Sequence, residues 1–406
     1  MDMDIMQAKQ LVIDAGKTLL ETGLIARTWG NVSCRVSDTQ FVITPSGRAY
    51  DTLTPEEIVL VNIENLSYDG DVKPSSEKGI HAAVYKMRPQ MNFVIHTHQI
   101  NASVISALGM DINNLEGDAK EIIGDNIPLA SYGLPGTSKL REGVIAAMQR
   151  SESKGLIMAH HGALCMGADY NGAFAVASEL EKVCEQEVLK KCNTVTNKVA
   201  DSFDSVIEYV VEKFASDAPA AAEVEPFDSE RDGEVFNITD KSSGEIVRID
   251  IESGALVGGN DIPDTAQLHL AVYKKRKDVN SIIHSKSPDI LTASRLDKKM
   301  KPLLDDFAQL VGTSVKTARY NPNSTLKSSK KVVKALKGRN AVLLKDNGAL
   351  CVAGDTSDAQ AVEMVMEKGC KTQIGADLYG KIKPISPIEA KLMRIIYLKK
   401  YSKQKK

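Results

Sequence analysis

An internal repeat places the strongest constraint on the fold of this chain. Residues 63–98 align without gaps on residues 251–286, and both segments contain the pattern His-x-Ala-Val-Tyr-Lys-x-Arg, which begins at His81 and at His269. A Gly-Ala-Leu-Cys sequence follows further along each copy. Self-similarity over this length describes a folding unit rather than a short motif. The chain of 406 residues therefore divides into two related domains, each long enough to bury its own core.

Apolar periodicity and turn residues predict an α/β fold in which short strands alternate with helices. In the first copy we expect helices over 4–22, 77–87, 138–149 and 169–192, and buried strands over 93–97 and 156–159. The stretch 215–228, rich in Ala and Pro, is typical of a linker. We therefore expect one domain over 1–214 and a second over 229–406. The pattern does not determine the order of the strands.

Three histidines of the first copy indicate a metal site. His96 and His98 end an apolar run, and residues two apart in a strand point to the same side. A third histidine, His161, follows a second buried strand, and the carboxylate of Glu77 lies upstream. Three protein ligands with one open position are the arrangement of catalytic zinc. The imidazole set favours Zn²⁺, and Mn²⁺, Fe²⁺ or Co²⁺ are the alternatives.

The second copy lacks this group of side chains. Glu77, His98 and His161 align with Thr265, Lys286 and Asn347, whereas His96 is kept as His284. The simultaneous loss of three of the four groups indicates that they work as one unit. His81 is kept as His269, so we interpret it as structural. We predict a catalytic first domain and a degenerate second domain without a metal site.

Three short loops of the first copy carry the small residues and donors that bind anions. They are Gly-Asn-Val-Ser at 30–33, Thr-Pro-Ser-Gly at 44–47, and the serine pair at 75–76. Backbone N–H groups and hydroxyls in such turns can hold a phosphate. Each loop alone is weak evidence for an anion site, because glycine and serine also fill ordinary turns. Together, and next to Glu77, they predict a phosphate pocket.

Charge and composition exclude several classes of protein. Residues 1–224 carry 19 Lys+Arg and 30 Asp+Glu, and residues 225–406 carry 32 and 23, a net −11 and +9. No nucleic-acid motif accompanies the lysines, so we expect the opposite charges to serve docking between the halves or between copies. No segment has the length of a membrane span, and the acidic N-terminus is not a secretory signal. Six cysteines without close pairs suggest reduced thiols, so we expect a cytoplasmic protein.

The order of these motifs resembles the class II aldolase/adducin family, and within it the L-fuculose-1-phosphate aldolases. The motifs are Gly-Asn-Val-Ser, Thr-Pro-Ser-Gly, Pro-Ser-Ser-Glu, His-x-His and His-His-Gly, and they cover residues 1 to about 200. A degraded copy covers 235–375. The resemblance implies two tandem three-layer α/β/α sandwiches, each with a mainly antiparallel central sheet. It also implies that His96, His98 and His161 bind zinc, that Glu77 is the acid/base, and that the substrate phosphate is held by Asn31, Ser46, Gly47, Ser75 and Ser76.

The resemblance further implies a metal-dependent aldolase, a carbon–carbon lyase of carbohydrate metabolism. Such an enzyme cleaves a ketose 1-phosphate, its sugar-phosphate substrate, to dihydroxyacetone phosphate and a small aldehyde through a zinc-stabilised enediolate. A divalent cation stabilises that charge as a Lewis acid, and a nearby carboxylate moves the proton. The alternatives are related family chemistry, namely an epimerase, a dehydratase or a decarboxylase, or a non-catalytic adducin-like interaction protein.

One residue departs from the family pattern. Leu129 stands where the family's aldolases have a tyrosine, which leaves the proton donor to the aldehyde oxygen unassigned. Family members commonly form fourfold tetramers with sites between subunits. A fused pair of a working and a degenerate copy would mimic two subunits. We therefore expect a homodimer whose four domains form a pseudo-tetramer, in which the second domain forms one wall of the site in the first.

Overall fold

The computed structural model describes all residues except 1–2, 26–28, 216–218, 297, 381 and 402–406. Internal contacts divide the chain into two compact units. The first unit comprises residues 1–198 and two short segments near the C-terminus, and the second comprises 199–378 and 384–397. Each unit is described by itself. The domain limits expected from the sequence, at 214 and 229, remain a prediction.

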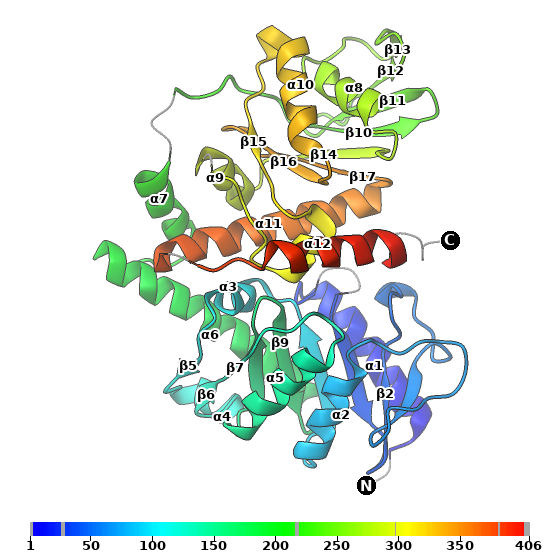
Figure 1. Cartoon of the computed structure of the whole chain (residues 1–406), viewed down its shortest axis with the longest axis vertical. Helices are drawn as coiled ribbons and strands as arrows, with labels where there is room; N and C mark the ends of the chain where they lie inside the picture. Colours follow the sequence, from blue (N-terminus) through cyan, green and yellow to red (C-terminus); the bar gives the residue numbers. More distant parts are fainter. Residues whose placement is uncertain (1–2, 26–28, 216–218, 297, 381, 402–406) are drawn as a thin grey trace. The chain divides into compact units, whose positions relative to one another are not determined.

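The first unit contains one seven-stranded sheet, which is coloured blue to green in Figure 1. Its strands run in the order β3-β2-β1-β4-β9-β8-β7, and of the neighbouring pairs only β7 and β8 are parallel. The strands are β1 (Asn31–Arg35), β2 (Gln40–Ile43), β3 (Val59–Asn62), β4 (Phe93–Thr97), β7 (Leu129–Ala130), β8 (Gly155–Met158) and β9 (Gly162–Gly167). A separate ladder joins β5 (Ile112–Asn113) to β6 (Asn126–Ile127).

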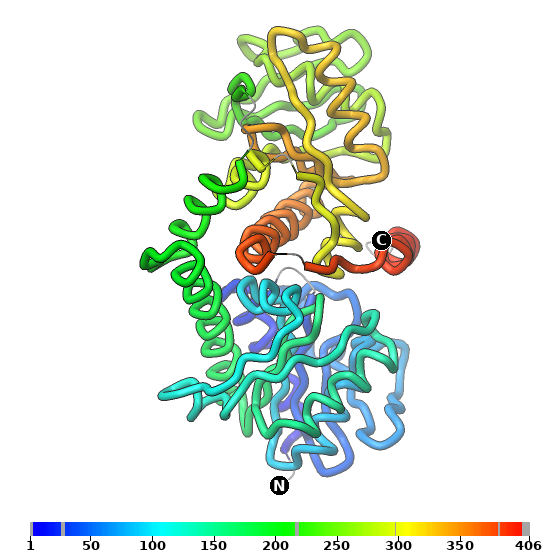
Figure 2. The backbone as a smooth tube through the Cα atoms, turned by 60° about the vertical axis from the view of Figure 1, so that its left-hand side comes forward, coloured from blue at the N-terminus to red at the C-terminus, as the bar shows by residue number. Residues whose placement is uncertain are grey.

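Helices pack against the strands of this sheet. The helices are α1 (Ile5–Glu21), α2 (Lys78–Met87), α3 (Ile100–Leu108), α4 (Gly117–Ile122), α5 (Ser138–Gln149) and α6 (Tyr170–Thr196), with a 3₁₀ turn η1 (Tyr50–Thr52). Apolar side chains of α2 and α5 share one buried cluster with the strands, whereas α3 and α6 contact β8 and β9 and each other. The long helix α6 can be followed in green in Figure 2. The α/β class predicted from the sequence is confirmed.

The second unit repeats the strand order of the first with one strand added. Its sheet runs β13-β12-β11-β10-β14-β17-β16-β15, and only β15 and β16 pair in parallel. The strands are β10 (Phe227–Asp232), β11 (Val235–Asp240), β12 (Ile246–Asp250), β13 (Leu256–Gly258), β14 (Ser281–Ser285), β15 (Thr317–Ala318), β16 (Ala341–Leu344) and β17 (Ala349–Ala353). The helices are α7 (Phe203–Phe214), α8 (Ala266–Lys275), α9 (Pro288–Leu296), α10 (Thr325–Leu336), α11 (Thr356–Tyr379) and α12 (Pro387–Ile396), with short turns η2 (Phe307–Val311), η3 (Pro322–Ser324) and η4 (Tyr397–Tyr401).

The registers of the two sheets also correspond. Ser33 pairs with Val94 in the first unit, and Ser229 pairs with Ile282 in the second. Ser229 is therefore the counterpart of Ser33, and Phe227 that of Asn31, because each lies two residues earlier on its strand. This equivalence lies outside the segment that aligns in the sequence, so only the pairing of the strands reveals it.

The loops differ more than the sheets. In the first unit, residues 44–58 connect β2 to β3 and carry the Thr-Pro-Ser-Gly motif. In the second unit, a short turn after Asp240 connects the corresponding strands β11 and β12. Its Oδ1 accepts the backbone N–H groups of Ser242 and Ser243, which closes the turn. The second unit therefore lacks one of the predicted phosphate-binding loops.

Candidate active site

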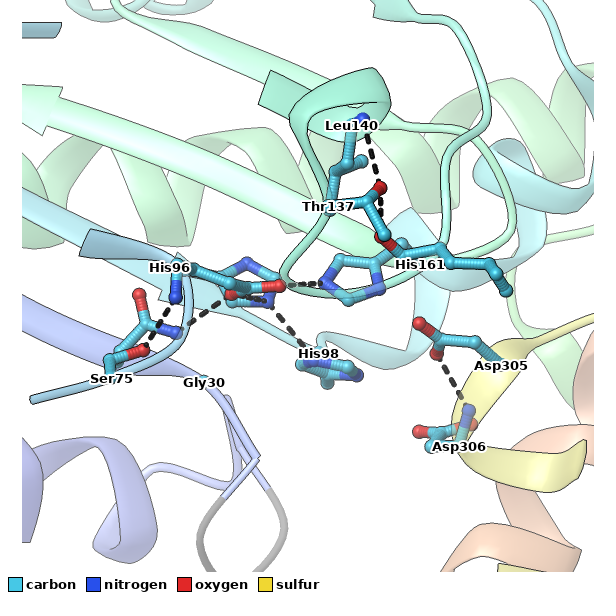
Figure 3. A network of polar contacts seen from close by, with 12 residues as sticks. Gly30, Ser75, His96, His98, Thr137, Leu140, His161, Asp305 and Asp306 are labelled. Carbon is cyan, nitrogen blue, oxygen red and sulfur yellow. Dashed lines mark hydrogen bonds and ion pairs between the residues drawn. The ribbon is translucent and has the colours of Figure 1, made fainter. Parts of the chain in front are cut away.

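The end of strand β4 presents two histidines to one side of the sheet. His96 pairs across the sheet with Asn31 of β1 and with Leu164 of β9, so it sits in the centre of the ladder. His98 lies one residue beyond the strand and leans the same way as His96. Both side chains are buried. The rings lie beside that of His161 in Figure 3.

A tight turn between β8 and β9 supplies the third imidazole. His160 adopts a left-handed backbone conformation with φ 58°, a region that His, Asn and Asp tolerate better than most residues. Gly162 then restarts the ladder, and a Cβ there would lie 2.2 Å from the Thr97 carbonyl oxygen. The close approach of the two strands brings His161 over His96, and the rings stack with centroids 4.7 Å apart.

The three rings form a group that could hold a metal ion. Their ligand nitrogens all lie within 4.8 Å of one another, and each residue is buried. The Nδ1 of His96 donates to the Ala163 carbonyl at 2.9 Å, which leaves Nε2 with its lone pair for an ion. The Nε2 atoms of His96 and His98 are 3.1 Å apart. A shared cation between them fits this donor set, because zinc binds imidazole nitrogen at about 2.1 Å.

Glu77 places a carboxylate against two of the rings. Its Oε1 lies 3.1 Å from Nε2 of His161, and its Oε2 lies 3.5 Å from Nε2 of His96. Burial acts to raise the pKa of this carboxyl, but His96, His161 and a hydrogen bond from Asn31 outweigh it and hold the pKa well below its ordinary value. Burial lowers the pKa of His96 well below its usual range. An ionised carboxylate beside imidazole nitrogens is a ligand environment that suits a divalent cation.

Glu77, directly after the serine pair at 75–76, is the N-cap residue of α2. Its own side chain makes no capping hydrogen bond. The Oγ of Ser75 instead accepts the backbone N–H of Glu77 at 3.2 Å. Because the helix begins at Lys78, the carboxylate of Glu77 is free of the backbone and turns toward the histidines.

The predicted phosphate residues divide into an inner and an outer set. Asn31 and Ser75 are buried. The Asn31 side chain donates to the Glu77 carboxylate, and the Ser75 hydroxyl accepts the backbone N–H of Glu77. Ser46 is half-buried, and Gly47 and Ser76 are exposed. The two loops are joined, since the Ser75 N–H donates to the Thr44 carbonyl at 3.0 Å and Pro45 bridges to Pro74. The loops therefore line one edge of the site. Their part in phosphate binding stays a prediction.

His81 has a closer relation to the site than its recurrence in the second copy indicated. It lies one helical turn after Glu77 on α2, and its Nε2 hydrogen-bonds to Oδ1 of Asn31. The Asn31 Nδ2 donates to Glu77 Oε2 at 2.8 Å. On the other side of the ring, Nδ1 lies 2.6 Å from the Ser33 hydroxyl, which in turn meets the Tyr85 hydroxyl at 2.7 Å. The i, i+4 spacing was the signal in the sequence that could have connected His81 to Glu77.

The corresponding position in the second unit is closed by the chain's own linker. Asn347, the counterpart of His161, accepts the Val224 N–H at 2.8 Å and donates to the Ala222 carbonyl at 2.9 Å. Lys286, the counterpart of His98, lies 3.7 Å from Glu223. Val224 is buried in the core of this unit. Asn347 thus binds the backbone of the linker, and Lys286 lies near a carboxylate of the same segment.

Comparison with known proteins identifies the family. The family model described as the class II aldolase and adducin N-terminal domain matches residues 10–188 and 237–374, more than half of the chain. The chain belongs to this family. Two separate matches within one class II aldolase/adducin chain agree with the repeat in its sequence.

Several curated relatives of this family member match over most of their own length and are named as aldolases. A 5-methylthioribulose-1-phosphate/5-deoxyribulose-1-phosphate aldolase of Escherichia coli O45:K1 is 33% identical over 212 residues, which is 52% of this chain and 97% of the relative. The L-fuculose phosphate aldolase of Escherichia coli K12 is 32% identical over 203 residues, 50% of this chain and 92% of the relative. A solved L-fuculose 1-phosphate aldolase is 28% identical, with a TM-score of 0.44, and covers 51% of this chain and 96% of its own.

No helix among the described residues combines the length and the apolar character that crossing a membrane requires. All six cysteines are free and buried. Leu129, for which the resemblance implies a tyrosine in the family's aldolases, lies in β7, where its backbone N–H donates to Asp111 at 2.6 Å. Its side chain has no group that can donate a proton.

Proposed function

We propose that the first unit is a metal-dependent aldolase that cleaves a ketose 1-phosphate to dihydroxyacetone phosphate and a small aldehyde. The observation that carries the proposal is the convergence of three buried imidazoles and one carboxylate in the first unit, beside a second unit that has replaced three of these four groups. A non-catalytic interaction domain with the same fold does not need such a cluster. Chemistry at an ion does, because the ion requires donor atoms with a free lone pair and the reaction requires a base.

His96, His98 and His161 would hold the ion, and we propose zinc because imidazole ligands suit it. The ion, when bound, supplies Lewis-acid polarisation of the substrate carbonyl. Glu77 would take and return the proton at the reacting carbon, since its carboxylate is ionised and faces the same rings. The loops that carry Asn31, Ser46, Gly47, Ser75 and Ser76 would hold the phosphate and so fix the reacting carbon in place.

We also infer that the two units are tandem three-layer α/β/α sandwiches with mainly antiparallel sheets. The common strand order and the matching registers support this inference. The second unit would be a copy whose site was lost. A homodimer in which two such chains form a pseudo-tetramer remains part of the proposal. Sedimentation equilibrium of the active protein tests it, and a monomer with full activity excludes it.

The substrate class is tested with a panel of ketose 1-phosphates. L-fuculose 1-phosphate, 5-methylthioribulose 1-phosphate and 5-deoxyribulose 1-phosphate follow from the names of the relatives. Cleavage is measured as dihydroxyacetone phosphate released with one equivalent of aldehyde. A changed sugar phosphate without aldehyde would indicate the related epimerase or dehydratase chemistry, for which Leu129 at the tyrosine position gives a reason. Protein purified without bound metal and without turnover would indicate an interaction protein.

Matched variants in the two units locate the reaction. His98→Ala should lose metal and turnover, whereas Lys286→Ala, at the counterpart position, should lose neither. Glu77→Gln should keep the metal and lower kcat by about 100-fold or more, the usual size of a general acid–base contribution. Thr265→Ala is its control. Normal turnover by Glu77→Gln would show that the proton-transfer role is wrong. Equal losses of metal and turnover in His98→Ala and Lys286→Ala would contradict the assignment of the site to the first unit.

A further inference from the structure

We propose that Asn31 and His81 are positioning residues that together hold the Glu77 carboxylate in its working orientation. The inference rests on the proposed function and refines it, because the sequence assigned Asn31 to the substrate phosphate and treated His81 as structural. Asn31, His81, Ser33 and Tyr85 form one buried chain of hydrogen bonds that ends at Glu77. All five side chains are buried.

The chemistry of the end group sets the direction of this chain. An ionised carboxylate only accepts hydrogen bonds, so the amide nitrogen of Asn31 must face Glu77 and the amide oxygen must face His81. That oxygen needs a donor, and His81 Nε2–H is the group in contact with it. With the proton on Nε2, Nδ1 accepts from the Ser33 hydroxyl, and Ser33 can accept from Tyr85. Each side chain in this series then has a donor or acceptor assignment that agrees with its neighbours.

Without His81, the amide oxygen of Asn31 loses its donor, and only Glu77 constrains the orientation of the amide. An amide group turned by 180° would present its oxygen to the Glu77 carboxylate, and two acceptors would face each other in a buried site. The histidine therefore holds the amide from its other side and reinforces the one rotamer of Asn31 that restrains Glu77 Oε2. Oε1 of the same carboxylate stays directed at His161, 3.1 Å away. A fixed carboxylate is what proton transfer to one face of a substrate requires.

The second unit shows which part of the chain belongs to packing alone. Ser229, His269 and Tyr273 repeat the inner three groups, with contacts of 2.7 and 2.8 Å. Phe227 replaces Asn31, Thr265 replaces Glu77, and His269 Nε2 has no hydrogen-bond partner in the described part of the chain. The Ser–His–Tyr group thus stabilises both units. Its extension to an amide and a carboxylate exists only in the unit with the metal group.

Two histidine variants separate positioning from packing. In the full-length, zinc-loaded enzyme, His81→Gln keeps a side-chain N–H at the position of Nε2, whereas His81→Asn is too short to reach Asn31. We expect His81→Gln to retain kcat within about threefold and His81→Asn to lose it by about 10- to 100-fold, with zinc content unchanged. A packing role would make the two variants equal, and that result would overturn the part assigned to His81. His269→Gln and His269→Asn are the controls and should both turn over normally.

The kinetic constants of Asn31→Ala separate positioning from phosphate binding. Positioning predicts a kcat lowered about 10- to 100-fold with KM within about twofold, and a double variant with His81→Asn no worse than the single ones, because the two residues act in series. A raised KM with normal kcat, together with weaker inhibition by inorganic phosphate, would instead assign Asn31 to the phosphate.

An NMR measurement tests the proposal independently of catalytic activity. The proposal requires His81 to carry its proton on Nε2, and ¹⁵N NMR of the ring distinguishes the two tautomers. The assignment comes from loss of the signal in His81→Gln. A proton on Nδ1 would overturn the proposal whatever the activity. If the tautomer is as expected and no ketose phosphate is cleaved, the proposed reaction fails while the hydrogen-bonded orientation of Glu77 stands.

Discussion

The buried histidine of the second unit, His269, should make the stability of that unit strongly dependent on pH. The side chain is completely buried, and its Nδ1 contacts Ser229 at 2.7 Å. Burial, with a smaller contribution from His284, lowers the pKa to about 3. The unfolded chain has a histidine pKa of about 6.5. Between these two values, the unfolded state binds a proton that the folded state excludes.

The sign follows from this difference. The contribution to stability is fully present above about pH 6.5 and is lost progressively as the pH falls toward 3, because acid favours the state that binds more protons. Each pKa unit corresponds to about 1.4 kcal/mol, so the whole shift is on the order of 4 to 5 kcal/mol. Between pH 6 and pH 4, His269 alone should contribute a slope of about 1.4 kcal/mol per pH unit.

His269→Asn removes this titration and keeps a polar group near Ser229. Urea unfolding should be followed at pH 7.5, 6, 5 and 4.5 by circular dichroism, with pulsed hydrogen exchange to assign the transition, since the single tryptophan, Trp29, lies in the first unit. The variant should lose about 1.4 kcal/mol per pH unit of slope in the acidic range. Val272→Ala, also buried on α8, is the control that destabilises without changing the slope. An unchanged slope in His269→Asn would refute the reasoning.

Three further predictions concern single contacts. Arg88→Ala should destabilise the first unit by about 2 to 3 kcal/mol, because the Arg88 guanidinium donates to two carbonyls at the end of α5. A decrease in the free energy of unfolding below about 0.5 kcal/mol, measured by tryptophan fluorescence, would contradict this. Gly162→Ala should lower the zinc content, since its methyl group would collide with the Thr97 carbonyl and displace the turn; stoichiometric zinc by mass spectrometry would argue otherwise. Asn347→Ala should destabilise the second unit by about 1 to 3 kcal/mol, by leaving the Val224 N–H unpaired, while turnover stays normal; reduced turnover at full stability would be the contrary result.

The sequence predicted the local elements around the site well, because their causes are local. The apolar run that ends at His96 forms β4, and the spacing of two residues puts His98 on the same side. The contact between His96 and His161 has a different origin. It depends on β9 lying beside β4, and β9 is separated from β4 by more than sixty residues of chain. Hydrophobic pattern gives the face of a strand but not its neighbour.

The structural reading of His81 illustrates a second limit. Comparison of the two copies in sequence showed that the histidine survives without the metal group, which suggested packing alone. The difference that matters is Asn31 against Phe227, two positions that the gapless alignment does not include. The strand pairing of Ser33 and Ser229 makes them equivalent. A residue can therefore be kept for packing in both copies while its free nitrogen serves the site in only one.

The loss of the site from the second unit follows the same physical rule as its presence in the first. Buried polar groups need partners, and a cation or a peptide can provide them. In the first unit, three imidazoles and a carboxylate converge with donors that suit an ion. In the second, Asn347 binds the backbone of the linker at Ala222 and Val224. Restoring a single histidine there would unpair the linker without completing a metal group, so the replacements form a stable alternative rather than a damaged copy.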